Sequence, residues 1–96
     1  MQFLVLTRRR MEVFPAEAWT PELLEREAQR VRELFSAGII RNAWRRKETP
    51  GAALLLEAAT EGEVRAAVAS LPLAQLEMLE VATLTQLDPY PGFGPR

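Results

Sequence analysis

The sequence predicts one α+β domain with the element order β-α-β-β-α-β. Three observations lead there. Two helix-start motifs, Thr20-Pro21-Glu22 and Thr60-Glu61-Gly62-Glu63, divide the chain. Short apolar segments flank each helix, and the turn dipeptide Pro50-Gly51 separates the two that lie between the helices. The length of 96 residues leaves room for only one domain.

The first half of the chain supplies a strand and a long helix. Gln2–Arg8 is rich in Phe, Leu and Val and is expected to be the first strand. The helix is predicted to run from its cap at Thr20 to Ala37, with Gly38 as a left-handed C-cap. Its apolar stripe has helical spacing and consists of Leu24, Ala28, Val31 and Phe35. Its charged residues, which are predicted to form a solvated face, include Glu25, Glu27, Arg30 and Arg32.

The second half supplies three strands and a shorter helix. The strands are expected over Ile39–Arg46, Ala52–Ala58 and Leu76–Leu87, and the nearly continuous apolar run of the middle one favours a central position. The helix that follows Thr60 has an inner stripe of Val64, Ala67, Val68 and Leu71. A folded domain over 1–87 and a Pro/Gly-rich tail over 88–96 are therefore expected.

Right-handed connections would place both helices on one face of a four-stranded antiparallel sheet, the ferredoxin-like arrangement. The other face would then be bare, with Leu4, Leu6, Trp44 or Met78 exposed on it. A domain of this size has a thin core, and the absence of cysteine rules out disulfides as support. The sequence therefore predicts a homo-oligomer in which such faces are covered.

Composition excludes several classes of function. With no His and no Cys, the chain has no Ser-His-Asp triad, no thiolate metal site and no cysteine nucleophile. A net charge of -1 argues against nucleic acid as a partner, although Arg8-Arg9-Arg10 are consecutive. No apolar run approaches the roughly 20 residues of a membrane span, and no signal peptide is evident, so a cytoplasmic location is expected.

Four pieces of the sequence together resemble one family. They are Ala37-Gly38, the strand Arg41-Asn42-Ala43-Trp44-Arg45, the segment Ser70-Leu71-Pro72-Leu73, and an acidic strand with Glu77 and Glu80. Their order and spacing resemble the muconolactone delta-isomerase family. The resemblance implies a dimeric α+β barrel built by sheet-to-sheet packing, often assembled into larger rings. It also implies cofactor-free movement of a double bond in a carboxylated lactone during catabolism of aromatic compounds.

The chain departs from the family pattern at three positions. Leu4 and Leu6 stand where the resemblance implies polar or ionisable side chains, and Asn42 stands where it implies a His. Two interpretations therefore remain. One is an isomerase-like enzyme that acts on a small carboxylated lactone; the other is a non-catalytic oligomer that binds a small acid or only assembles.

Candidate site residues follow from what proton transfer beside a carbonyl requires. A base with a raised pKa is needed, and Glu80 on a bare apolar sheet face is the preferred candidate, with Glu57 second. Arg41 or Arg45 would clamp a substrate carboxylate, while Asn42 and Trp44 would line the pocket. The structural alternatives are arginine stems that cover a sheet edge, a core or interface Trp44, and a Glu80 paired with an arginine of a partner sheet. Trp19, in the loop before the first helix, is interpreted as a loop anchor rather than a lid.

Overall fold

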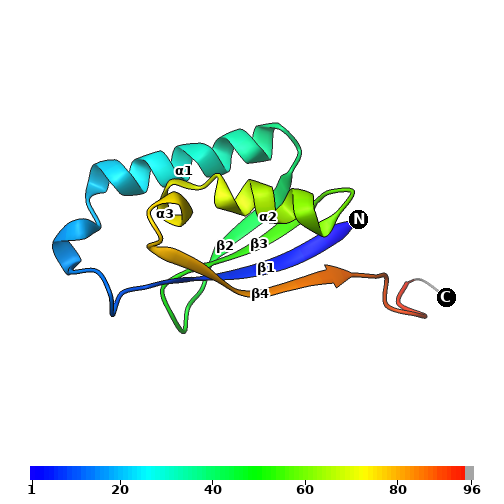
Figure 1. Ribbon diagram of the computed structural model, residues 1–96. Helices are drawn as coiled ribbons and strands as arrows, with labels where there is room; N and C mark the ends of the chain where they lie inside the picture. The colour runs from blue at the N-terminus through cyan, green and yellow to red at the C-terminus, as the bar shows by residue number, and fades with distance from the viewer. Residues whose placement is uncertain (95–96) are drawn as a thin grey trace.

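A computed structural model of the chain describes residues 1–94 and contains four strands and three α-helices (Figure 1). A short 3₁₀ turn, Ala16–Ala18, precedes the first helix. In chain order the elements are β1 (Gln2–Arg9), α1 (Pro21–Ser36), β2 (Ile40–Arg45), β3 (Ala52–Glu57), α2 (Glu61–Ala69), α3 (Pro72–Gln75) and β4 (Leu79–Leu87). The predicted βαββαβ order is confirmed, with α3 as an addition.

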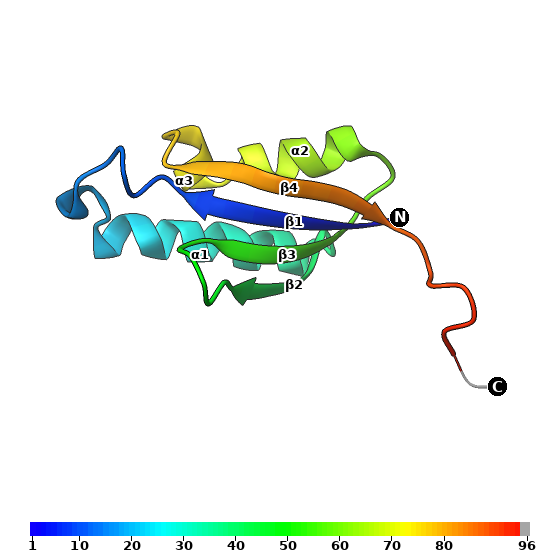
Figure 2. The same cartoon turned by 90° about the horizontal axis from the view of Figure 1, so that it is seen from below.

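The sheet has the strand order β2-β3-β1-β4, and every neighbouring pair is antiparallel. Figure 2 shows the sheet from its uncovered side, with the helices behind it. The apolar strand β3 is central, as predicted. This is the ferredoxin-like arrangement, and it leaves one sheet face without helices.

The core lies between the sheet and the helices. Alternate residues of the central strands point into it, among them Phe3 and Val5 of β1 and Leu54 and Leu56 of β3, each no more than 2% exposed. The predicted inner stripe of α2 is confirmed, because Val64, Ala67, Val68 and Leu71 are all buried. Each large apolar side chain buried in this way contributes about 1.5–3 kcal/mol.

Helix α1 begins and ends as predicted, but its buried line differs. The Thr20 hydroxyl accepts a hydrogen bond from the Leu23 amide at 3.1 Å, and Gly38 has the left-handed φ of 79°. The predicted stripe is only partly correct: Phe35 is 61% exposed, whereas Leu23 and Leu34 are the fully buried residues. Leu23 and Leu34 lie inside the core, whereas Leu24 and Val31 of the predicted stripe pack against it and are only partly buried.

The predicted start of the fourth strand at Leu76 is wrong. Pro72 begins the short helix α3, and Glu77 closes it in a left-handed conformation with φ 59°. The chain then turns inward, where the Met78 amide donates to the Leu73 carbonyl at 2.9 Å. Met78 is therefore 3% exposed in the core, and its predicted place on the bare face is also wrong.

The uncovered face is less apolar than predicted. Leu4 and Leu6 are half-buried on it, and Trp44 is 51% exposed at the β2 edge. Strand β4 contributes threonines there, because Thr85 pairs with Leu4 and Thr83 with Leu6. Oligomerisation through this face stays a prediction.

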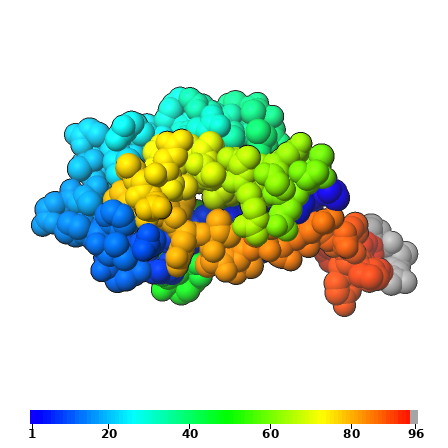
Figure 3. All heavy atoms as spheres, in the orientation of Figure 1, coloured from blue at the N-terminus to red at the C-terminus, as the bar shows by residue number. Residues whose placement is uncertain are grey.

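After Leu87 the chain leaves the body of the molecule. Space-filling Figure 3 shows this segment extending beyond the end of the sheet. Tyr90 and Phe93 are 77% and 87% exposed. Residues 95–96 of the predicted tail lie outside the described residues. Within residues 1–94, no helix has the length and apolarity to cross a membrane.

Candidate active site

A cavity of about 400 Å³ opens between α1 and one end of the sheet; we call it the inner cavity. Helix α1 provides one wall through Leu24, Ala28 and Val31 of the predicted stripe. The ends of the strands and the start of α3 provide the others. The remaining lining residues are Thr7, Arg9, Glu27, Arg32, Trp44, Arg45, Gly51, Ala52, Leu73 and Leu79.

Among residues 1–94, Glu27 is the only carboxylate that lines the inner cavity. It projects from α1, and its Oε1 accepts a hydrogen bond from the Leu73 amide at 3.0 Å. Burial raises the pKa of Glu27 above its ordinary value of 4.5, although the Leu73 hydrogen bond and the positive charge of Arg9 lower it in part. A carboxylate held in a fixed position with a raised pKa has the properties of a general base.

Two arginines at the cavity, Arg9 and Arg45, are candidates to bind an anion. In the described part of the chain, neither Arg9 nor Arg45 forms an ion pair. The guanidinium of Arg9 lies over the Trp19 ring, 5.8 Å from its centroid, which holds the side chain in place. Arg32 differs because it bonds Glu25 and Gln29. Arg9 and Arg45 are therefore the groups able to bind an anion.

The floor of the cavity depends on Thr7 and Gly51. The Thr7 side chain is buried in the sheet, and its hydroxyl accepts the Ala52 amide at 3.0 Å. The pairing of β1 with β4 shifts register between Leu6 and Thr7. Gly51 packs so closely that a Cβ there would lie 2.0 Å from the Thr7 carbonyl oxygen. A residue without a side chain is therefore required at position 51.

The structure separates the predicted substrate-binding residues. Trp44 and Arg45 line the inner cavity, whereas Arg41 and Asn42 do not. The Asn42 side chain instead accepts a hydrogen bond from the Ala43 amide at 2.8 Å. Arg41 is exposed on edge strand β2.

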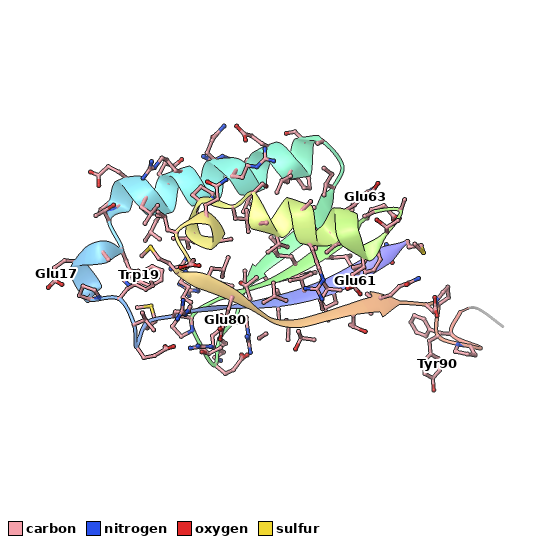
Figure 4. The ribbon with its side chains drawn as sticks, viewed as in Figure 1. Glu17, Trp19, Glu61, Glu63, Glu80 and Tyr90 are labelled. Carbon is pink, nitrogen blue, oxygen red and sulfur yellow. The ribbon has the colours of Figure 1, made fainter. Side chains whose placement is uncertain are left out.

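Glu80 also lies outside the inner cavity. It pairs with Arg8 across β1 and β4, with a nitrogen–oxygen distance of 2.7 Å, and its side chain is 47% exposed (Figure 4). Arg8 also pairs with Glu12. The hydrogen bond to Glu12 and then that to Glu80 raise the pKa of Arg8, and the Arg8 contact lowers the pKa of Glu12 to about 2. Glu80 thus pairs with an arginine of its own chain, whereas the alternative interpretation was a pair with an arginine of a partner sheet.

Sequence reasoning missed Glu27, which was assigned to the solvated face of its helix. The sequence does carry an indication. Glu27 follows Leu23 by four residues and precedes Leu34 by seven, so it shares the buried line of α1. An acid on a buried helix line is unusual enough to suggest a function.

Trp19 packs edge-on against Phe14, with ring centroids 6.2 Å apart, as the anchor interpretation predicts. Its indole N–H is buried and has no hydrogen-bond partner within the described residues. Also within residues 1–94, no three acidic side chains gather in a way that could hold a metal ion.

Comparison with solved structures defines the fold. A crystal structure of muconolactone isomerase superposes with a TM-score of 0.74 at 19% identity, covering 96% of this chain and 93% of that one. A 5-chloro-2-hydroxyhydroquinone dehydrochlorinase from Burkholderia phenoliruptrix, in complex with 2,5-dihydroxybenzoquinone, gives 0.62 at 18% identity, with coverage of 92% and 94%. Both comparisons establish the same fold. No curated protein matches the sequence significantly.

The family follows from the sequence. The model of the muconolactone delta-isomerase family matches residues 1–90. The chain therefore belongs to that family, as its motifs predict.

Proposed function

We propose that this protein catalyses a cofactor-free proton-transfer isomerisation of a small carboxylated lactone in the inner cavity. Glu27 would carry the proton. The observation that supports this most is the position of Glu27: no other carboxylate of the described residues lines this largely apolar and basic cavity, and burial raises its pKa. The expected setting is catabolism of aromatic compounds in the cytoplasm.

The reaction balances with Glu27 alone. The Glu27 carboxylate takes a proton from the saturated ring carbon, and the electron pair of that C–H bond moves into the ring to give a dienolate. Negative charge develops on the lactone carbonyl oxygen. The Glu27 carboxylic acid then returns the proton to the carbon beside the carbonyl, so that the double bond has moved and the formula is unchanged.

Arg45 and Arg9 would supply the positive charge that this sequence needs. A guanidinium binds a carboxylate through two parallel hydrogen bonds, which would fix the substrate relative to Glu27. The same charge stabilises a dienolate more strongly in a cavity with apolar walls than in water. Leu24, Ala28 and Val31 provide such walls on the α1 side.

The residues that depart from the family pattern lie outside the inner cavity. Leu4 and Leu6 belong to the uncovered side of the sheet, and neither they nor Asn42 line the inner cavity. The activities of the structural neighbours also suit proton transfer. A dehydrochlorinase, like an isomerase, has to move a proton on a small oxygenated molecule.

We further propose that two chains associate through the uncovered face. Leu4, Leu6 and Trp44 would lie in the contact. Face-to-face packing would bury the apolar surface that this small domain leaves exposed.

The test is turnover of muconolactone, followed by the absorbance of the enol-lactone product, for the wild type, Glu27→Gln and Glu80→Gln. Loss of a general base lowers kcat about 10²–10⁴-fold, and this loss is expected for Glu27→Gln only. Gln retains the oxygen that accepts the Leu73 amide, so the fold should survive. Loss in Glu80→Gln alone would assign the proton to Glu80, and an inert wild type would favour the non-catalytic binding protein.

A further inference from the structure

A second hollow, the outer basin, adjoins the inner cavity. Its volume is about 630 Å³, and it is lined by Arg9 and by the whole β2–β3 turn from Arg45 to Gly51. Arg9, Arg45 and Gly51 line both hollows. A ligand in the inner cavity could therefore extend past these residues into the outer basin.

The outer basin is strongly basic although the chain as a whole carries a net charge of -1. Four cationic side chains line it, Arg9, Arg45, Arg46 and Lys47, against one carboxylate, Glu48. The excess of positive charge is thus a local property of this end of the sheet.

One of the four cations is already occupied by the fold. Arg46 pairs with Glu48 at 2.7 Å, and its Nη1 donates to the Thr7 carbonyl at 3.2 Å. No ion pair within residues 1–94 includes Arg9, Arg45 or Lys47. Three cations that form no ion pair thus line the connected hollows: Glu48 of the outer basin is taken by Arg46, and Glu27 of the inner cavity interacts with Arg9 only through its charge.

We propose that the outer basin is a second anion-binding subsite, so that the preferred ligand is an organic dianion. This inference rests on the proposed function for the placement of the first carboxylate at Arg45 and Arg9. The second anionic group would then lie at Lys47, whose ammonium is a compact charge on a flexible stem. A monoanion would leave Lys47 unused.

The probes are phenylacetate and 1,4-phenylenediacetate, which share a ring and differ by one carboxymethyl group. Each is titrated into the wild-type protein by calorimetry. The dianion is expected to bind about tenfold more tightly, the scale of one additional charge-assisted contact.

Two variants, each of which removes one positive charge, test whether the preference for the dianion arises in the outer basin. Lys47→Met should abolish the preference and leave phenylacetate binding unchanged. Arg26→Met, on the exposed surface of α1 and outside both hollows, should keep the preference. Equal affinities in the wild type, no binding of either probe, or the same loss in both variants would overturn the proposal.

These measurements need no turnover, so the two proposals can fail separately. If turnover depends on Glu27 but the protein does not prefer the dianion, only the proposal of an outer subsite is refuted. A preference for the dianion that depends on Lys47 without lactone turnover would support the subsite and count against the isomerase.

Discussion

Replacement of Gly51 by Ala tests how tightly the turn between β2 and β3 is joined to β1. The new Cβ would lie 2.0 Å from the Thr7 carbonyl oxygen and 2.9 Å from its carbon. Carbon–oxygen contacts are normally no shorter than about 3.3 Å, so the two segments must separate by roughly 1 Å. The φ of 151° at Gly51 is also a conformation that residues with side chains rarely adopt.

The loss in free energy of unfolding follows from the contacts that this separation disturbs. The Thr7 carbonyl accepts from Arg46 and the Thr7 hydroxyl accepts from the Ala52 amide, and each such bond contributes about 1 kcal/mol. Backbone strain adds about 1–3 kcal/mol. Gly51→Ala should therefore destabilise the fold by about 3–5 kcal/mol. At about 4–8 °C per kcal/mol, the melting temperature should fall by at least 10 °C or so.

Gly62→Ala is the matched control. Gly62 lies in α2, and a Cβ there would meet only Thr60 Oγ1, at an ordinary 3.7 Å. Since Ala is favoured over Gly in a helix by roughly 0.5–1 kcal/mol, this variant should melt slightly above the wild type. Both melting temperatures are measured by circular dichroism. A Gly51→Ala protein that melts with the wild type or with Gly62→Ala would refute the close approach.

Three further predictions concern assembly, the tryptophans and pH. Sedimentation at micromolar concentration should show no folded monomer of 10.8 kDa, because the uncovered sheet face is partly apolar; a stable monomer would contradict this. Trp44→Ala should reduce the oligomer mass, because Trp44 lies at the proposed contact between chains. Trp19→Ala should mainly lower the melting temperature, because Trp19 packs against Phe14 and Arg9 within one chain. Equal effects of both variants on oligomer mass and melting temperature would argue against an interface Trp44 and an internal Trp19. Burial raises the pKa of Glu27 above 4.5, the ordinary value that it has in the unfolded state. Between these two pKa values the native state binds more protons than the unfolded state. The free energy of unfolding of the wild type therefore falls as the pH rises through that range. Glu27→Gln should therefore melt above the wild type near neutral pH, with the gap closing below pH 4.5, and a gap that does not change with pH would exclude a raised pKa.

The fold was largely predictable because its elements carry strong local information. Thr20 and Thr60 both cap helices through their side chains, and β3 is central, as its apolar run predicts. The fourth strand was placed too early because Leu76–Met78 reads as apolar strand, whereas the turn at Glu77 depends on tertiary bonds such as that from Met78 to Leu73. Local patterns do not contain such contacts.

The candidate site was only half predictable for a similar reason. The strand motif predicted Trp44 and Arg45 as ligand-binding residues, and both line the inner cavity, although their role stays a prediction. Glu27 was missed because the sequence of the helix does not reveal which of its apolar residues meet the core. Arg9 ends strand β1 and Lys47 lies in the β2–β3 turn, so the two approach the same hollow only once β1 pairs with β3.

The central claim is that ligand chemistry occurs between α1 and the sheet, at Glu27. It is tested most directly by a crystal structure of the protein with an unreactive saturated lactone that carries a carboxymethyl group. We expect the ring between α1 and the strand ends, with a ring carbon beside the Glu27 carboxylate and the ligand carboxylate on Arg45 or Arg9. A ligand bound on the uncovered face of the sheet, beside Glu80, would contradict the claim.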